Sequence, residues 1–406
     1  MKDRIIKYNS FLLNCLVFLT FLGFYVVIMM LVSSGMGELT RRVSIPLRIV
    51  IGVVAGLLFL QNYKKKNKFI LWFLLFVFVY SFRVFVDYLK SEFFYIPYSD
   101  LIFYFLSFCV VPFIAIVKVD FSKIKIESLF NVFLISALVF SLLSVVLYSK
   151  FIGVVGRLSS SSAGEDVVNP LIISYCATLV IGVIVFYMMY NKTSKLIKLI
   201  SFITIALSTA PFFLGSSRGS IFALFFPFLI LMFSSLSVRN IFRIILISGI
   251  VLIALIYLDS FFDSGLLDRF TGTKEAIETG SSSASRLDIW KYSLDQFIDY
   301  PLFGDKLNTN IVNFYPHNIF LEALQSIGFF GFIPFLVLLI YALRYSMYIF
   351  KKKPQYAWLT IFFLQALMQN MFSGALYTAA WFWTGMALVL SLYSSIKKEE
   401  IKGRIT

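Results

Sequence analysis

The chain alternates between long apolar runs and short polar segments. Each run has 17 or more residues with few charges, which is enough for a helix to cross the roughly 30 Å hydrocarbon core of a bilayer. The runs are continuous and do not alternate between apolar and polar positions, so they favour helices over barrel strands. The pattern predicts twelve membrane spans, at about 11–31, 43–60, 69–86, 101–117, 129–149, 171–190, 196–214, 220–237, 241–258, 328–350, 356–373 and 376–395.

The composition agrees with an all-α, polytopic membrane protein. Hydrophobic residues make up 60% of the chain and charged residues 14%, against about 45–50% and about 25% in soluble domains. Such a chain has too few polar side chains to cover a surface in water. Cytosolic enzymes, secreted disulfide scaffolds and disordered proteins are therefore excluded. Each of the three cysteines lies inside an apolar run, as small buried residues do.

The positive charges predict the orientation of the spans. The formal net charge is +15, and the Lys and Arg clusters fall at both chain ends and in alternate loops, at 64–68, 118–125, 192–198 and 351–353. Basic loops stay on the cytoplasmic side of a membrane. Both termini are therefore expected in the cytoplasm, and the basic excess indicates topology and not nucleic-acid binding. Residues 1–406 are expected to form a single integral membrane domain.

One outer segment, residues 259–316, is far longer than the other loops and is inserted between the ninth and tenth predicted spans. Its apolar positions recur at helical spacing, at Leu287, Trp290, Leu294 and Phe297. Ser285 and Asp288 have the spacing of a capping box, and Pro301 follows the end of the pattern. The segment therefore predicts an amphipathic helix on the outer membrane surface, with Trp290 at headgroup level.

The chain has one histidine, His317, which follows the long loop on the outer side. An imidazole with a pKa near 6.5 suits a general base at neutral pH, although a solvated loop histidine is the simpler alternative. Asn318 and Tyr315 are its neighbours and are candidates for contacts with substrate. The sequence has no His/Cys cluster or paired carboxylates, so no metal site is predicted.

Two arginines lie at predicted helix starts on the outer face. Arg218 follows Ser217 at the start of the eighth span, and Arg286 lies in the first turn of the amphipathic helix. A cation is disfavoured at a helix N-terminus unless an anion is bound there. The pair therefore suggests a phosphate site, with membrane anchoring as the alternative for each arginine.

Two further arginines, Arg48 and Arg83, fall inside the second and third spans. A charge within the bilayer is costly unless it is paired or hydrated. These side chains are expected either to line a polar cavity or to pack against acidic partners such as Asp87 and Glu92.

At these positions the chain resembles the bacterial O-antigen ligase and O-antigen polymerase superfamily. The resemblance covers roughly residues 205–345 and rests on three motifs in order, while the N-terminal half matches only in hydropathy. The motifs are Ser217-Arg218-Gly219, then Ser285-Arg286-Leu287-Asp288-Ile289-Trp290 with Pro301-Leu302-Phe303-Gly304, and then Pro316-His317-Asn318 with Gly328-Phe329-Phe330-Gly331.

The resemblance implies a metal-independent, inverting glycosyltransferase without a cofactor, acting on the outer face of the bacterial inner membrane. Such enzymes transfer an oligosaccharide from undecaprenyl diphosphate to an acceptor hydroxyl. By this resemblance, Arg218 and Arg286 would bind the diphosphate and His317 would take the acceptor proton. Ser217, Tyr315 and Asn318 would support these contacts.

The resemblance leaves the acceptor open. A polymerase, which is the first expectation, extends another lipid-linked repeat unit, whereas a ligase transfers the polysaccharide to lipid A–core. Besides membrane lipid, a chain-length regulator and a flippase are expected partners. A flippase for lipid-linked sugars is a further alternative for the chain itself. Ion-coupled carriers, however, usually have intramembrane carboxylates and two similar halves, which this sequence lacks.

Overall fold

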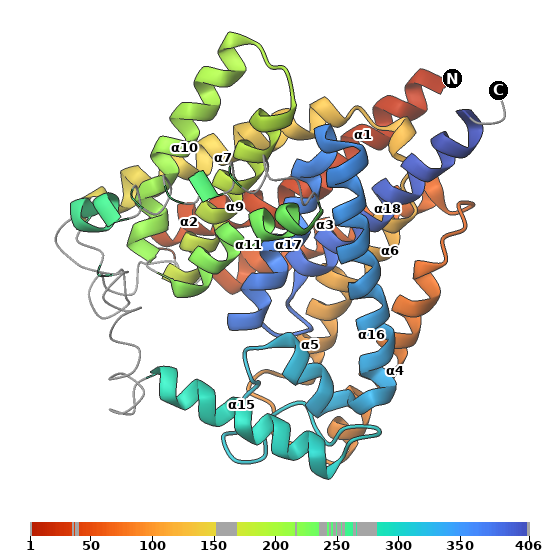
Figure 1. Ribbon diagram of the computed structural model, residues 1–406. Coiled ribbons are helices and arrows are strands. Elements are labelled where there is room, and N and C mark those ends of the chain that lie inside the picture. Colours follow the sequence, from red (N-terminus) through yellow and green to blue (C-terminus); the bar gives the residue numbers. More distant parts are fainter. Residues whose placement is uncertain are drawn as a thin grey trace.

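The computed structural model describes a molecule built from helices (Figure 1). It describes residues 2–34, 36, 40–151, 169–215, 217–234, 242, 245–246, 249, 253, 256–262, 265 and 282–403. Within these residues every regular element is a helix, as the continuous apolar runs predicted.

Eight helices in the described residues are long and apolar enough to cross a membrane. The chain is therefore a multi-pass membrane protein. Three of these eight spans combine several elements: α1 (Lys2–Phe18), η1 (Leu19–Gly23) and α2 (Phe24–Ser33); α5 (Tyr98–Tyr104), η3 (Phe105–Val110) and α6 (Val111–Val117); and α7 (Ile126–Tyr148) with η5 (Ser149–Phe151). The other five are α3 (Thr40–Asn62), α4 (Phe69–Leu89), α9 (Pro170–Tyr190), α10 (Lys195–Gly215) and α16 (Ile319–Lys352).

The count of twelve spans stays a prediction. Three of the remaining four predicted spans correspond to helices that are shorter or less apolar: α11 (Arg218–Ser234), α17 (Ala357–Phe372) and α18 (Ala380–Gly403). The fourth, 241–258, lies largely outside the described residues. Short 3₁₀ turns at η4 (Phe121–Lys123) and η6 (Pro354–Tyr356) precede α7 and α17.

The tenth predicted span begins earlier than expected. Helix α16 starts at Ile319 and not at 328, directly after the histidine motif. Its backbone is broken at Gly328, where φ is +54° and ψ is −163°. A short helical segment, 319–327, therefore precedes the main membrane helix, and apolar periodicity alone did not distinguish it from loop.

The predicted amphipathic helix is present as α15 (Ser282–Asp299). It lies across the end of the bundle opposite the two chain termini (Figure 1). The helix starts one turn before Ser285, so the predicted capping box is wrong and Arg286 lies in the second turn.

The predicted inner face of α15 is also wrong in part. Leu287 and Leu294 are exposed, whereas Ile289, Ser293 and Gln296 are buried against the protein. This face packs partly on α16, where the Phe297 and Phe329 ring centres are 5.1 Å apart, and partly on the backbone of a polar loop, which explains why Gln296 lies there. The placement of α15 at a membrane surface stays a prediction.

Candidate functional site

The loop that carries His317 is held in place by α15. The indole nitrogen of Trp290 donates a hydrogen bond of 2.8 Å to the carbonyl of Pro316, the residue before the histidine. Gln296, one and a half turns later, donates to the carbonyl of Asn308 at 3.2 Å and accepts from the backbone N–H of Asn310 at 3.0 Å. Trp290 thus helps to hold the histidine loop, and its expected position at lipid headgroup level stays a prediction.

The second and third motifs pack directly against each other. The N–H groups of Phe329 and Phe330 donate to the carbonyls of Pro301 and Leu302 at 2.8 and 3.1 Å. The broken helix at Gly328 makes this possible, because the break frees two N–H groups that an unbroken α16 would use internally. A Cβ on Gly328 would also overlap the carbonyl of Leu302. The two glycine-containing motifs thus form one structural unit beneath the histidine loop.

The outer end of α4 anchors the same loop. Arg83 donates through Nη2 to the carbonyls of Phe303 and Gly304, at 3.1 and 2.9 Å. Asp87 pairs with Arg83 at 3.4 Å and accepts from the N–H of Leu307 at 2.9 Å. Of the two alternatives for Arg83, packing against an acidic partner is the one found.

Glu92, the other expected acidic partner, pairs with a different residue, and Arg48 packs against aromatic rings. Glu92 pairs with Lys306 at 3.3 Å and not with Arg83. Arg48 is surrounded by aromatic rings, with its guanidinium 3.9 Å from the centre of the Tyr104 ring, and its Nη1 donates to Ser44 at 3.1 Å. Cation–π contacts of this kind stabilise a partly buried arginine, so Arg48 also packs within the bundle.

His317 has an unusual backbone and an unpaired ring atom. Its φ is +56°, in the left-handed region that residues with a Cβ rarely adopt. Its Nδ1 is buried and has no hydrogen-bond partner within the described part of the chain. Such strain and an unsatisfied buried atom are typical of functional positions.

The charge state of His317 is set by its surroundings. Burial, followed by the positive charge of Arg286, lowers the pKa of His317 from 6.5 to about 4. Both causes disfavour the imidazolium form. The ring is therefore neutral at physiological pH and has a lone pair available to accept a proton.

Aromatic rings surround the histidine. The Tyr315 ring centre lies 4.4 Å from that of His317, and Phe314 lies 5.2 Å from it. Tyr95, from the loop after α4, packs 5.5 Å from Tyr315 and shares a hydrogen bond with the hydroxyl of Tyr377. Burial, and secondarily the charge of Glu322, raise the pKa of Tyr315 to about 12, so its hydroxyl stays protonated.

Arg286 lies within electrostatic range of both His317 and Arg218, the first residue of α11. These residues are distant in sequence and come from α15, the start of α11 and the loop before α16. Two cations held within range of each other repel, and a bound anion offsets that cost.

The two supporting residues, Asn318 and Ser217, have structural roles. The side-chain oxygen of Asn318 caps α16 by accepting from the N–H groups of Phe320 and Leu321 at 3.0 and 3.3 Å. Ser217 is buried just before α11, and its backbone carbonyl accepts a hydrogen bond of 2.6 Å from the hydroxyl of Ser220. Neither arrangement tests their expected contacts with substrate.

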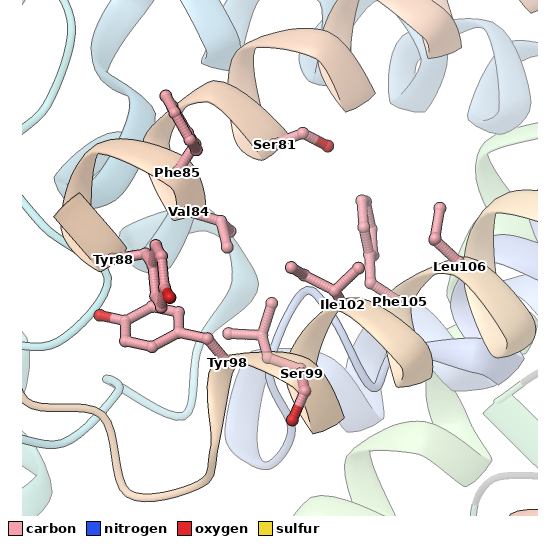
Figure 2. Close-up of a pocket in the computed structure, with 10 residues that line it drawn as sticks. Ser81, Val84, Phe85, Tyr88, Tyr98, Ser99, Ile102, Phe105 and Leu106 are labelled. Atoms are coloured by element: carbon pink, nitrogen blue, oxygen red, sulfur yellow. The ribbon is translucent and has the colours of Figure 1, made fainter.

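A separate pocket of about 470 Å³ lies between α4 and the start of the next span (Figure 2). Its lining is almost entirely apolar, and the tyrosines at its rim are Tyr88 and Tyr98. None of the candidate site residues lines it, so it lacks the charged groups that phosphate or sugar chemistry requires. For metal binding, no group of three or more His, Cys, Asp or Glu side chains occurs among the residues that the structure describes.

Sequence reasoning missed several residues that build the site. Trp290 was assigned to the membrane surface, and Tyr175 carries no motif and lies on α9, well before the first one. The capping motif around Asn318 was the one available signal for the early start of α16, because Asn followed by Glu322 in the first turn is typical of a helix N-terminus.

Comparison with known proteins places these elements in a family. Residues 203–336 match the model of a family described as O-antigen ligase. The matched segment contains Arg218, Arg286 and His317, and it confirms the resemblance to the O-antigen ligase and polymerase superfamily. No match was found among curated proteins.

Proposed function

We propose that this membrane protein, which through residues 203–336 belongs to the O-antigen ligase and polymerase superfamily, is a polymerase of bacterial surface polysaccharide. It transfers an oligosaccharide from undecaprenyl diphosphate to a hydroxyl of another lipid-linked repeat unit, on the outer side of the inner membrane. The observation that carries the proposal is the position of Arg286, within electrostatic range of both Arg218 and His317.

In this proposal the two arginines bind the donor's diphosphate. Arg218 stands at the N-terminus of α11, where free backbone N–H groups and the helix dipole also favour an anion. The diphosphate gains negative charge as its bond to the sugar breaks. Fixed guanidinium groups stabilise that charge more in the transition state than in the ground state, which lowers the barrier.

His317 acts as the general base. The acceptor hydroxyl donates its proton to the neutral imidazole as its oxygen attacks the anomeric carbon. The bond from that carbon to the phosphate oxygen breaks on the opposite face, so the configuration inverts and undecaprenyl diphosphate leaves. The unpaired Nδ1 of His317 is a candidate for the proton-accepting atom.

Donor binding and base strength are coupled in this arrangement. The charge of Arg286 helps to keep the pKa of His317 at about 4 in the free protein. A diphosphate bound to Arg286 neutralises that charge, and the pKa of the imidazole rises. The base therefore becomes stronger when the donor is in place, so that binding prepares the site for proton transfer.

A ligase is the second candidate, because the matched family carries that description. Both reactions break the same donor bond and use the same three residues; they differ in the acceptor. We place the polymerase first because polymerases are many and diverse in the superfamily that the chain resembles.

The test is deletion of the gene, followed by gel electrophoresis of the surface polysaccharide and of the lipid-linked sugars. Loss of a polymerase leaves single repeat units attached to the core. Loss of a ligase leaves no attached repeats, with polymer accumulating on the lipid carrier. Re-expression of the wild type is expected to restore the ladder, and His317→Ala at equal protein level to leave it absent. A normal ladder from His317→Ala would remove the base assignment.

A further inference from the structure

Helix α9 packs against the turn that carries the Ser217-Arg218-Gly219 motif. The hydroxyl of Ser174 lies 2.7 Å from that of Ser220, which donates to the carbonyl of Ser217 at 2.6 Å. A Cβ on Gly215, at the end of α10, would overlap both α9 backbone and Ser174. The start of α11, and with it Arg218, is therefore fixed by close contact with α9.

Tyr175 lies at the centre of this contact and is 4% exposed. A Cβ on Gly219 would overlap its hydroxyl. The phenol oxygen therefore lies against the first turn of α11, and the glycine of the motif is needed to leave it room. Ser217 and Arg286 are both close enough to Tyr175 to act on it electrostatically.

We propose that Tyr175 is a third diphosphate-binding residue, whose hydroxyl accepts the Ser217 proton and donates its own proton to the diphosphate held by Arg218 and Arg286. This inference rests on the proposed function and assigns a residue outside the segment that matches the family. The arginines already repel each other, so a neutral donor adds a hydrogen bond to the anion without adding to that repulsion.

The chemistry suits a leaving group whose charge increases. A hydrogen bond to a charged acceptor is stronger than one between neutral groups, and removing the donor leaves the anion oxygen without that partner in a partly desolvated site. The Tyr175 side chain is buried and its hydroxyl packs against Gly219 before substrate arrives, so little reorganisation is needed.

The experiment measures binding of farnesyl diphosphate to the full-length protein in nanodiscs, by calorimetry, for the wild type and for Tyr175→Phe. We expect Tyr175→Phe to weaken binding about tenfold, the loss expected for one charge-assisted hydrogen bond. The matched control is Tyr187→Phe on the same helix. The Tyr187 ring stacks on Phe130, with the two ring centres 3.3 Å apart, away from the motif. The affinity of this variant for farnesyl diphosphate is expected to be unchanged.

Arg286→Gln separates the two proposals. If it abolishes binding while Tyr175→Phe binds like the wild type, the role of Tyr175 is refuted and the diphosphate site stands. If neither substitution changes affinity, the proposed site itself is wrong.

A double substitution tests the placement of the hydroxyl. Gly219→Ala is expected to weaken binding strongly because the new methyl group meets the Tyr175 hydroxyl. In the Tyr175→Phe background the nearest atom is the ring Cζ, 3.2 Å from the new methyl group, which is a tight contact but not an overlap, so the same glycine substitution is expected to cost less. An equal cost in both backgrounds would show that the hydroxyl does not lie against Gly219.

Discussion

Arg286 is the residue that connects the others, since its guanidinium acts on Arg218, His317 and Tyr175. Lysine at this position keeps the charge but loses the planar fork that grips two phosphate oxygens. Arg286→Lys is therefore expected to retain less than about a tenth of the wild-type turnover, measured with lipid-linked donor in proteoliposomes. Arg344→Lys, far along α16, is the matched control and is expected to be fully active. Full turnover by Arg286→Lys would indicate that Arg286 anchors the protein in the membrane and does not bind the diphosphate.

The titration of His317 is measurable directly because the chain has one histidine. In ¹³C-histidine-labelled protein we expect its signal to titrate near pH 4, since burial and Arg286 both oppose protonation. Saturating inorganic pyrophosphate is expected to raise the midpoint of this titration. As the pH is lowered, kcat, which concerns the enzyme with donor bound, is therefore expected to fall at a higher pH than kcat/KM does. A midpoint near 6.5 that pyrophosphate leaves unchanged would refute the coupling.

Residue types that are rare in this chain could be selected from the sequence as candidates for the site, whereas residue types that are common could not. A lone histidine and cations at helix starts stand out in a chain with so few charges. Tyr175 is one of 22 tyrosines, and only the fold brings it to Gly219. The expected substrate contact of Asn318 stays a prediction, and its side-chain oxygen also caps α16, a role that was not predicted from the sequence.

At the scale of elements, the break in α16 is what joins the second and third motifs. Gly328 has a φ of +54°, and a Cβ there would overlap the carbonyl of Leu302. With ψ at −163° the residue lies in a region that is essentially restricted to glycine, and a residue with a side chain there costs about 1–3 kcal/mol before any overlap is counted. Gly328→Ala is therefore expected to lower the melting temperature by several degrees and to reduce turnover.

Gly52→Ala is the matched control for this substitution, because a Cβ at Gly52 in α3 meets nothing within 4 Å. Alanine also has the higher helix propensity, so unchanged or slightly raised stability is expected. Equal melting temperatures for the two variants would show that the contact between the motifs contributes nothing.

Helix α15 shows what the apolar periodicity of the sequence predicts correctly and what it does not. The apolar spacing correctly predicted a helix, but it placed Leu287 and Leu294 on the inner face, where the structure has Ser293 and Gln296. Sequence periodicity presumes an apolar partner. Here part of the partner is apolar, since Phe297 packs on Phe329 of α16, and part is the backbone of the loop before His317, to which Gln296 makes hydrogen bonds.

At the scale of the molecule, the proposed chemistry requires the α15 end of the bundle to face outwards. The charge pattern predicts this orientation, and Figure 1 places both termini at the opposite end. In a background without the three native cysteines, Ile311→Cys, which is 65% exposed in the wild type, is expected to react with an impermeant maleimide in intact spheroplasts. Lys351→Cys is expected to react only after permeabilisation. The reverse pattern would place the site in the cytoplasm.

The most direct test is a structure of the protein in nanodiscs with an undecaprenyl diphosphate-linked oligosaccharide bound. We expect density for the diphosphate between the guanidinium groups of Arg218 and Arg286, with the first sugar facing the imidazole of His317. A diphosphate bound at another part of the bundle, with these three side chains left without contact to it, would contradict the account.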